Sequence, residues 1–175
     1  SYPVSSNTLL ILGCVLLLFS VWKALGARQS LTALLGWMSL ADIAFVALGF
    51  ACDGAGGGTA AVLLLSYNGI ARLLAWFCLN RLRGITGSYA PADMAGIGRS
   101  APVTAALYAF SMFAALGISP LLTPDAKPFA LHAVLASGLL VAPMLMEFAN
   151  AAMAALTVLA VHAVWLGNGR YAADN

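Results

Sequence analysis

Long apolar runs with few charges between them are the feature that most limits how this chain can fold. Hydrophobic residues occupy 62% of the 175 positions and charged residues 8%, whereas soluble domains have about 45–50% apolar and about 25% charged residues. A helix that crosses a bilayer needs about 20 mainly apolar residues. The sequence therefore predicts an all-α fold, a polytopic transmembrane helix bundle of about six spans, with residues 1–175 as a single transmembrane domain.

The expected spans are separated by short polar or glycine-rich segments. They cover residues 8–25, 31–52, 59–82 and 101–122, and two more helices fit between 128 and 167. We place the break between these last two at 143–150, because Pro143 can end a helix. The longest loop, 84–100, contains Pro91, which favours a short interfacial helix over 92–97. No basic segment precedes the first run, so we do not expect a cleavable signal peptide.

The distribution of Lys and Arg predicts how the bundle is oriented. If six spans alternate, one end receives most of the basic residues: Lys23, Arg28, Arg81, Arg83 and Arg99, against Lys127 and Arg170 at the other. Cytoplasmic loops of membrane proteins carry the excess of Lys and Arg. We therefore expect the loop 84–100 to be cytoplasmic and both chain ends to lie outside.

The sequence argues against several functional classes. The basic residues are scattered singly, so they form no patch that could follow a phosphate backbone, and nucleic acid is not an expected partner. The sequence has no HExxH, P-loop or GxSxG motif. We therefore expect no catalytic residues, no metal and no cofactor, and a chain that is not an enzyme by itself.

Two charged residues fall inside expected spans. Asp42 lies about half-way along the second and Arg72 just past the middle of the third. A charge at the bilayer centre costs about 2.5–3.5 kcal/mol on insertion scales, so we predict that these two side chains contact each other. Asn68 lies one helical turn before Arg72, on the same face. The pair is interpreted either as part of a proton or cation path or as a structural ion pair.

Three segments resemble the antiporter-like membrane subunits shared by respiratory complex I, energy-conserving membrane-bound hydrogenases and multisubunit sodium/proton antiporters. Residues 27–46 (ARQSLTALLGWMSLADIAFV) are similar to the family's DLKRLLAYSSIxHxGFV run, and residues 68–77 (NGIARLLAWF) to HALFKALLFL. The third segment begins with DMAGIGR at 93–99, continues through PVTAA at 102–106 and GISP at 117–120, and closes at Lys127. It is similar to DLxGLGRxxPxTA…GxPPxxGFxSK. The resemblance covers about residues 20–130, with a looser continuation to 167, and corresponds to the later part of such a subunit.

The departures from the family pattern bear on mechanism. Thr32 stands where the family has a proton-path Lys, and Asn68 where it has a His. Arg72 replaces a Lys, and an arginine stays protonated, so it cannot load and release a proton. The resemblance therefore implies a truncated or degenerate antiporter-like subunit of a redox-driven ion-translocating complex, mainly a scaffold with at most a partial proton or cation path. Its candidate ion-path or ion-pair residues are Asp42, Arg72, Asn68, Thr32 and Lys127.

Two other functions fit the same sequence. One is a stand-alone secondary transporter that works as a homo-oligomer, and the other is a membrane accessory subunit unrelated to the family. For the leading hypothesis, we expect the partners to be the lipid bilayer and other membrane subunits of a larger complex. The chain would then be a non-catalytic subunit of a proton-translocating oxidoreductase, in a bacterial inner membrane.

Overall fold

The computed structural model describes residues 4–52, 56–117, 126–136, 138 and 140–167, and in these residues it contains helices and no strand. The elements in chain order are α1 (Val4–Gly26), α2 (Leu31–Ala51), α3 (Gly57–Thr86), the 3-10 helix η2 (Ile97–Arg99), α4 (Pro102–Leu116), α5 (Ala126–Ala136) and α6 (Val141–Leu166). The all-α fold class is confirmed.

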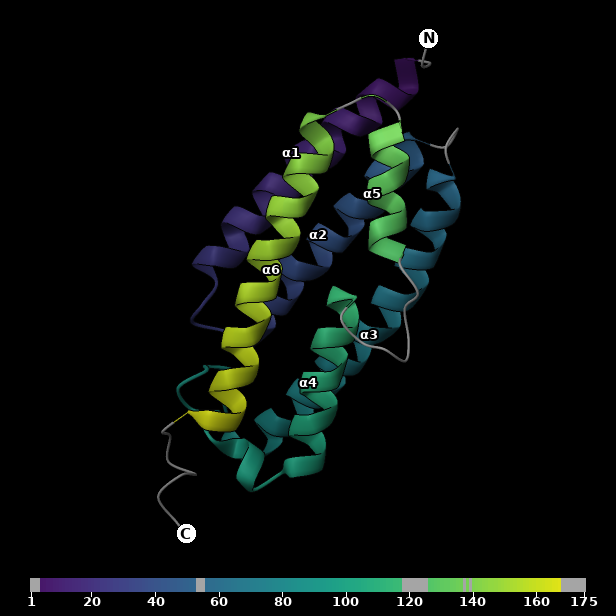
Figure 1. The fold of residues 1–175 in the computed structure, drawn as a ribbon. Coiled ribbons are helices and arrows are strands. Elements are labelled where there is room, and N and C mark those ends of the chain that lie inside the picture. The colour runs from purple at the N-terminus through teal and green to yellow at the C-terminus, as the bar shows by residue number, and fades with distance from the viewer. Residues whose placement is uncertain (1–3, 53–55, 118–125, 137, 139, 168–175) are drawn as a thin grey trace.

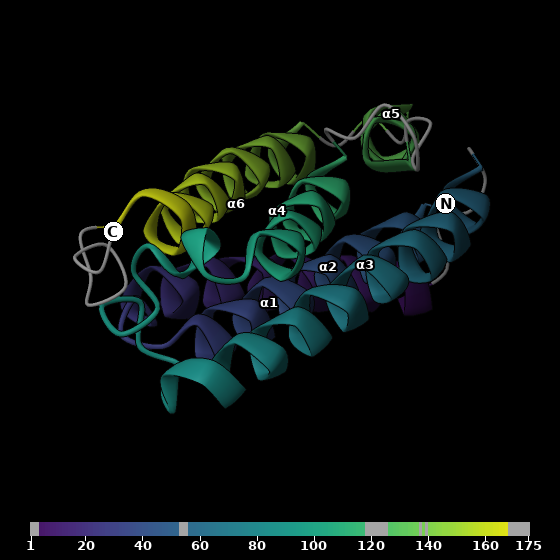
Figure 2. The ribbon, with the colours of Figure 1, turned by 90° about the horizontal axis from the view of Figure 1, so that it is seen from below.

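The helices form two layers. Helices α1, α2 and α3 lie side by side in one layer, and α6, α4 and α5 lie across it in the other (Figures 1 and 2). Helix α2 is central and packs against α1, α3, α5 and α6. Many outward-facing side chains are large and apolar, among them Ile11, Trp22, Leu73 and Leu140, which are 61–71% exposed. A surface of this kind is stable in lipid rather than in water, so the chain is an integral membrane protein.

Four of the described helices, α1, α2, α3 and α6, are long and apolar enough to cross a membrane. The other two are shorter. Helix α4 has 15 residues and α5 has 11, which at 1.5 Å per residue gives about 22 and 16 Å against a hydrocarbon core of about 30 Å. They run in the same direction, one above the other, and both pack against α3 (Figure 1). Together they make one passage, interrupted near its middle.

The shared passage of α4 and α5 changes which end of the bundle α6 reaches. The Gly96 N–H donates to the Ala163 carbonyl at 3.2 Å, and the Trp165 indole N–H donates to the Ala105 carbonyl at 3.3 Å. The last turns of α6 therefore lie beside the loop 84–100, while α1 begins at the opposite end (Figure 1). Helix α1 begins and α6 ends at opposite ends of the bundle, which contradicts the topology predicted from six alternating spans, in which α4 and α5 were counted as separate crossings. The chain ends themselves, residues 1–3 and 168–175, lie outside the described residues.

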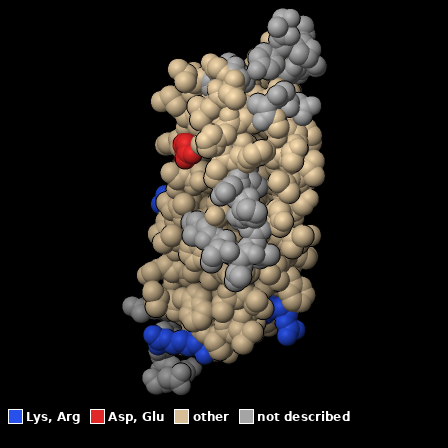
Figure 3. Space-filling view, turned by 45° about the vertical axis from the view of Figure 1, so that its right-hand side comes forward, with Lys and Arg blue, Asp and Glu red and all other residues tan. Residues whose placement is uncertain are grey.

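The prediction that most Lys and Arg residues lie at one end of the bundle agrees with the structure. Lys and Arg gather at one end of the face shown in Figure 3, and most of the rest of that face is uncharged. Lys127, however, lies inside the bundle with its side chain buried, so it does not belong to the opposite loop. Arg170 lies outside the described residues. Among the described residues, the end of the bundle away from the loop 84–100 therefore has no Lys or Arg of its own.

The break between the last two helices also differs from the predicted position. Helix α5 ends at Ala136, and Gly138, with φ +79°, follows it in the left-handed conformation that commonly ends a helix. Pro143 is the third residue of α6, where its missing N–H removes no helical hydrogen bond. Residues 143–150 are therefore helical. The short helix predicted over 92–97 is also absent, and turns cover 91–96 before η2.

Helices α2 and α3 approach each other closely because of glycines at their connection. A Cβ atom on Gly57 would collide with the Gly49 carbonyl oxygen and would lie 2.7 Å from the Cys52 carbonyl oxygen. A Cβ on Gly49 would lie 3.2 Å from that of Ala61. Small residues that allow backbones to approach in this way are characteristic of packed membrane helices. The close packing holds the last turn of α2 against the first turn of α3.

The revised topology predicts opposite labelling of two exposed positions. In a variant whose three cysteines are replaced by alanine, Ala92→Cys in the loop 84–100 should react with an impermeant thiol reagent only from the cytoplasmic side. Leu140→Cys, at the turn between α5 and α6, should react only from outside, because the basic end faces the cytoplasm. Right-side-out and inverted vesicles provide the two measurements. Labelling of both positions from the same side would contradict this topology.

Candidate functional site

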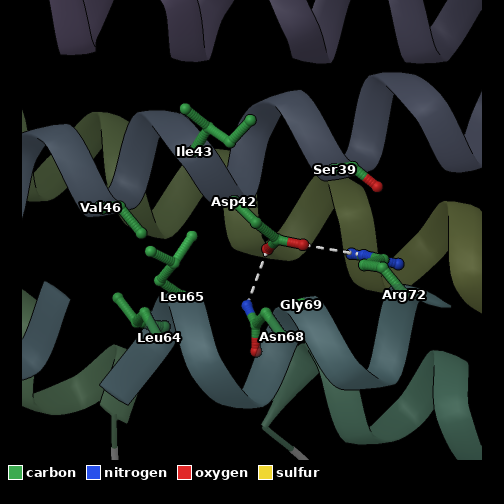
Figure 4. Close-up of a pocket in the computed structure, with 9 residues that line it drawn as sticks. All are labelled: Ser39, Asp42, Ile43, Val46, Leu64, Leu65, Asn68, Gly69 and Arg72. Carbon is green, nitrogen blue, oxygen red and sulfur yellow. Dashed lines mark hydrogen bonds and ion pairs between the residues drawn. The ribbon is translucent and has the colours of Figure 1, made fainter. Parts of the chain in front are cut away.

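A buried carboxylate lies at the centre of the bundle. Asp42, in the middle of α2, is 8% exposed. Its Oδ1 accepts a hydrogen bond from Asn68 Nδ2 at 2.9 Å, and its Oδ2 accepts one from Arg72 Nε at 2.8 Å (Figure 4). Both donors come from α3, one turn apart. The contact predicted between Asp42 and Arg72 is therefore confirmed, and Asn68 belongs to the same site.

A second cation reaches the same carboxylate from the other layer. Lys127, at the start of α5, places its Nζ atom 3.6 Å from Asp42 Oδ1. The same ammonium donates to Asn150 Oδ1 of α6 at 3.4 Å and lies 5.4 Å from the centre of the Phe45 ring. We call Asp42, Asn68, Arg72, Lys127 and Asn150 the polar cluster. Its members come from α2, α3, α5 and α6, so the cluster ties both layers together at mid-depth.

The polar cluster has more cations than anions among the described residues. Two cations, Arg72 and Lys127, face one carboxylate among the described residues. The acidic residue nearest to Lys127 in sequence, Asp125, lies outside the described residues. An isolated buried charge is costly, and a buried lysine can exist as the neutral amine whereas an arginine cannot. Lys127 is therefore the basic member of the cluster that can exchange a proton.

Lys127 lies where the passage of α4 and α5 is interrupted. In many transporters the ion site is built at the ends of such discontinuous helices. Lys127 is the second residue of α5, so its side chain starts at such a helix end.

Polar contacts from the cluster become weak in the direction of α4. Arg72 Nη1 lies 3.7 Å from the Met112 thioether sulfur, which is a weak acceptor. Tyr108, one turn away on α4, is fully buried, and its hydroxyl has no hydrogen-bond partner among the described residues. A chain of hydrogen bonds from Asp42 therefore ends at Met112 within the described part of the protein.

Thr32 lies apart from the polar cluster. It is the second residue of α2, ten positions before Asp42, which places it about 15 Å away along the helix axis. Its buried hydroxyl also has no hydrogen-bond partner in the described residues. Of the five predicted site residues, Asp42, Asn68, Arg72 and Lys127 come together and Thr32 does not.

A cavity of about 180 Å³ lies beside the cluster, between α2 and α3. Asp42, Asn68 and Arg72 provide its polar wall, and apolar side chains provide most of the rest (Figure 4). Its rim includes Ile43 and Leu65, which are 50% and 56% exposed, so the cavity opens toward the lipid-facing surface. The rest of its lining is mainly apolar, so the cavity suits an apolar occupant better than a group of ordered water molecules.

Two members of this site were not identified from the sequence. Asn150 is a lone amide inside an apolar span, which is a usable signal, but the helix break predicted at 143–150 placed it in a loop. Met112 gives no signal, because a methionine in an apolar helix is ordinary. The two histidines, His132 and His162, are exposed and take no part in the cluster. No group of three or more potential metal ligands occurs among the described residues.

The fold and site together define a polytopic helical membrane protein with a buried ion-pair cluster at its centre. Its fold is similar to part of one chain of the membrane-bound sulfane sulfur reductase, an archaeal respiratory membrane complex. The similarity has a TM-score of 0.84 and covers 94% of this chain at 17% sequence identity. It covers 34% of the other chain, so this protein spans about a third of that chain's length. No protein-family model matches the sequence, and no curated protein does.

Proposed function

We propose that this chain is a membrane subunit of a redox-driven ion-translocating complex, where it acts mainly as a scaffold and contributes at most a partial proton or cation path. The fold similarity to a chain of a respiratory membrane complex supports the assembly part of this proposal. The resemblance of residues 20–130 to antiporter-like subunits supports the same class. Without a catalytic motif, the chain would be a non-catalytic subunit of such an oxidoreductase, in the energy-conserving membrane.

The observation that carries the scaffold role is the structure of the polar cluster. Arg72 is a permanent cation bonded directly to Asp42, and a fixed positive charge at mid-depth opposes the passage of protons and cations. Beyond Arg72 the described polar contacts reach only the Met112 sulfur. A proton wire needs titratable groups or water at close intervals, and toward α4 no titratable side chain of the described residues is hydrogen-bonded to Arg72. The cluster instead joins four helices through ionic and amide contacts.

The partial path is assigned to Lys127 and the groups around it. Lys127 has an acceptor amide in Asn150 and an ion-pair partner in Asp42, and it begins the second half of an interrupted passage. When Lys127 is the neutral amine, Asp42 stays paired with Arg72 as a neutral buried pair. The cluster can therefore accommodate Lys127 in either protonation state, which requires no conduction across the whole bundle.

Native mass spectrometry of the gently solubilised assembly tests the proposed function. The tagged chain should be isolated with other membrane subunits and with iron–sulfur subunits, because a scaffold without redox centres depends on them. The unrelated accessory-subunit hypothesis predicts different companions. A complex that contains only copies of this chain, and that transports ions when reconstituted, would contradict the proposal and support the homo-oligomeric transporter.

A further inference from the structure

A second cavity lies at the basic end of the bundle, away from the polar cluster. It has a volume of about 130 Å³ and lies between the first turn of α2 and the last turns of α6. Its wall includes Leu31 and Leu34 of α2 and Leu156 and Ala160 of α6, all buried. Arg28 and Pro91 complete it on the side of the loops. The cavity therefore has an apolar floor within the helices and one cationic side chain at the level of the helix ends.

This arrangement combines the two requirements of a phospholipid. An acyl chain needs an apolar groove that continues into the bilayer, and Leu159, on the cavity wall, is 55% exposed on the lipid-facing surface of α6. A headgroup phosphate needs a cation at the membrane interface, and basic pockets between transmembrane helices bind anionic headgroups. Helix α2 begins at Leu31, so the positive end of its dipole lies at the same cavity.

The electrostatic surroundings favour an anionic over a zwitterionic headgroup. Lys23, Arg81, Arg83 and Arg99 lie at the same end of the bundle as Arg28, and the described acidic residue of the loop 84–100 is Asp93. Among the residues that line the cavity, Arg28 is the one that carries a charge. It is exposed and makes no ion pair among the described residues. We propose that this cavity binds an anionic phospholipid, with the phosphate on Arg28 and the first part of an acyl chain against α2 and α6.

Thermal unfolding of the purified, delipidated chain in detergent tests this site. Phosphatidylglycerol should raise the unfolding midpoint saturably, and phosphatidylcholine with the same acyl chains should have a much smaller effect. Arg28→Gln should weaken the apparent affinity for phosphatidylglycerol about fivefold, since one basic residue near the surface contributes about 1 kcal/mol. Arg28→Glu should weaken it further. Arg81→Gln, an exposed arginine at the same end that does not line the cavity, is the matched control and should leave the affinity unchanged.

Other results would overturn the proposal. Equal effects of the two lipids would show that the headgroup is not recognised. An equal saturable effect of inorganic phosphate would indicate a free-anion site rather than a lipid site. Equal losses for Arg28→Gln and Arg81→Gln would assign the effect to diffuse charge at the basic end. Both substitutions are at exposed positions, so folding of the variants should not limit the measurement.

Discussion

Replacing Asp42 with asparagine should destabilise the bundle by about 3–5 kcal/mol, the usual cost of removing one partner from a buried ion pair. The reason is that two cations pair with this one carboxylate. Arg72 Nε at 2.8 Å and Lys127 Nζ at 3.6 Å would both lose their anionic partner in a position where lipid and apolar side chains exclude water. The loss should appear as a lower free energy of unfolding in mixed micelles and as reduced assembly in the membrane.

Glu147→Gln is the matched control for the Asp42 variant. It removes one carboxylate from a long apolar helix, but Glu147 is exposed on α6 and outside the polar cluster. An outward-facing carboxylate within a membrane helix is itself unfavourable, so Glu147→Gln should not destabilise the bundle. If Asp42→Asn falls within the range of this control, then the ion pairs of the cluster do not stabilise the bundle.

The double variant Asp42→Asn with Arg72→Gln should recover most of the lost stability and assembly. It replaces the charged pair with neutral amides that can still bond to Asn68 and to each other, and exchanging a whole buried pair for neutral groups is often tolerated. Lys127 would remain, accommodated as the neutral amine beside Asn150. If the chain is mainly a scaffold, proton pumping per electron by the assembled complex should also stay close to that of the wild type.

Reconstituted vesicles allow assembly and pumping to be measured separately. Arg72→Gln alone is the comparison, since it leaves Asp42 with Lys127 and Asn68 and should be milder than Asp42→Asn. Normal assembly of the double variant together with a clear fall in protons per electron would mean that Asp42 and Arg72 belong to a working path. In that case the scaffold role would be wrong even though the assembly with redox subunits would stand.

Much of the polar cluster was accessible from the sequence because charged residues in apolar spans are costly and must find partners. Asp42 and Arg72 could be paired on that ground alone, and Asn68 followed from helical spacing. Lys127 was named from its place in a family-like segment, but the fifth span was predicted to begin at residue 128, whereas α5 begins at Ala126, and this left Lys127 in a loop. Asn150 was not identified because the helix break was predicted at 143–150, which placed this residue in a loop. In both cases the error was in where a helix ends, and not in which residues are polar.

Helix ends were harder to locate because the signals at them are ambiguous. Proline can end a helix or lie in its first turn, and Pro143 does the second. Gly138 was the informative residue, since its left-handed conformation ends the turn after α5. The apolar segment from 101 to 122 is long enough for a full span, yet α4 within it stops at Leu116, and Gly117 is in the left-handed conformation. Composition alone does not distinguish a full span from half of an interrupted one.

The sequence by itself determined that this protein is an all-helical membrane bundle, that its basic residues gather at one end, and that Asp42 and Arg72 pair. These features follow from the energetics of single segments in lipid, which residue type and spacing largely decide. Tertiary structure alone decided that α4 and α5 share one passage, that Lys127 and Asn150 join the carboxylate, and that α6 ends at the basic end. Those outcomes depend on how helices pack against α3 and α2, and packing between segments far apart in the chain leaves little trace in local composition.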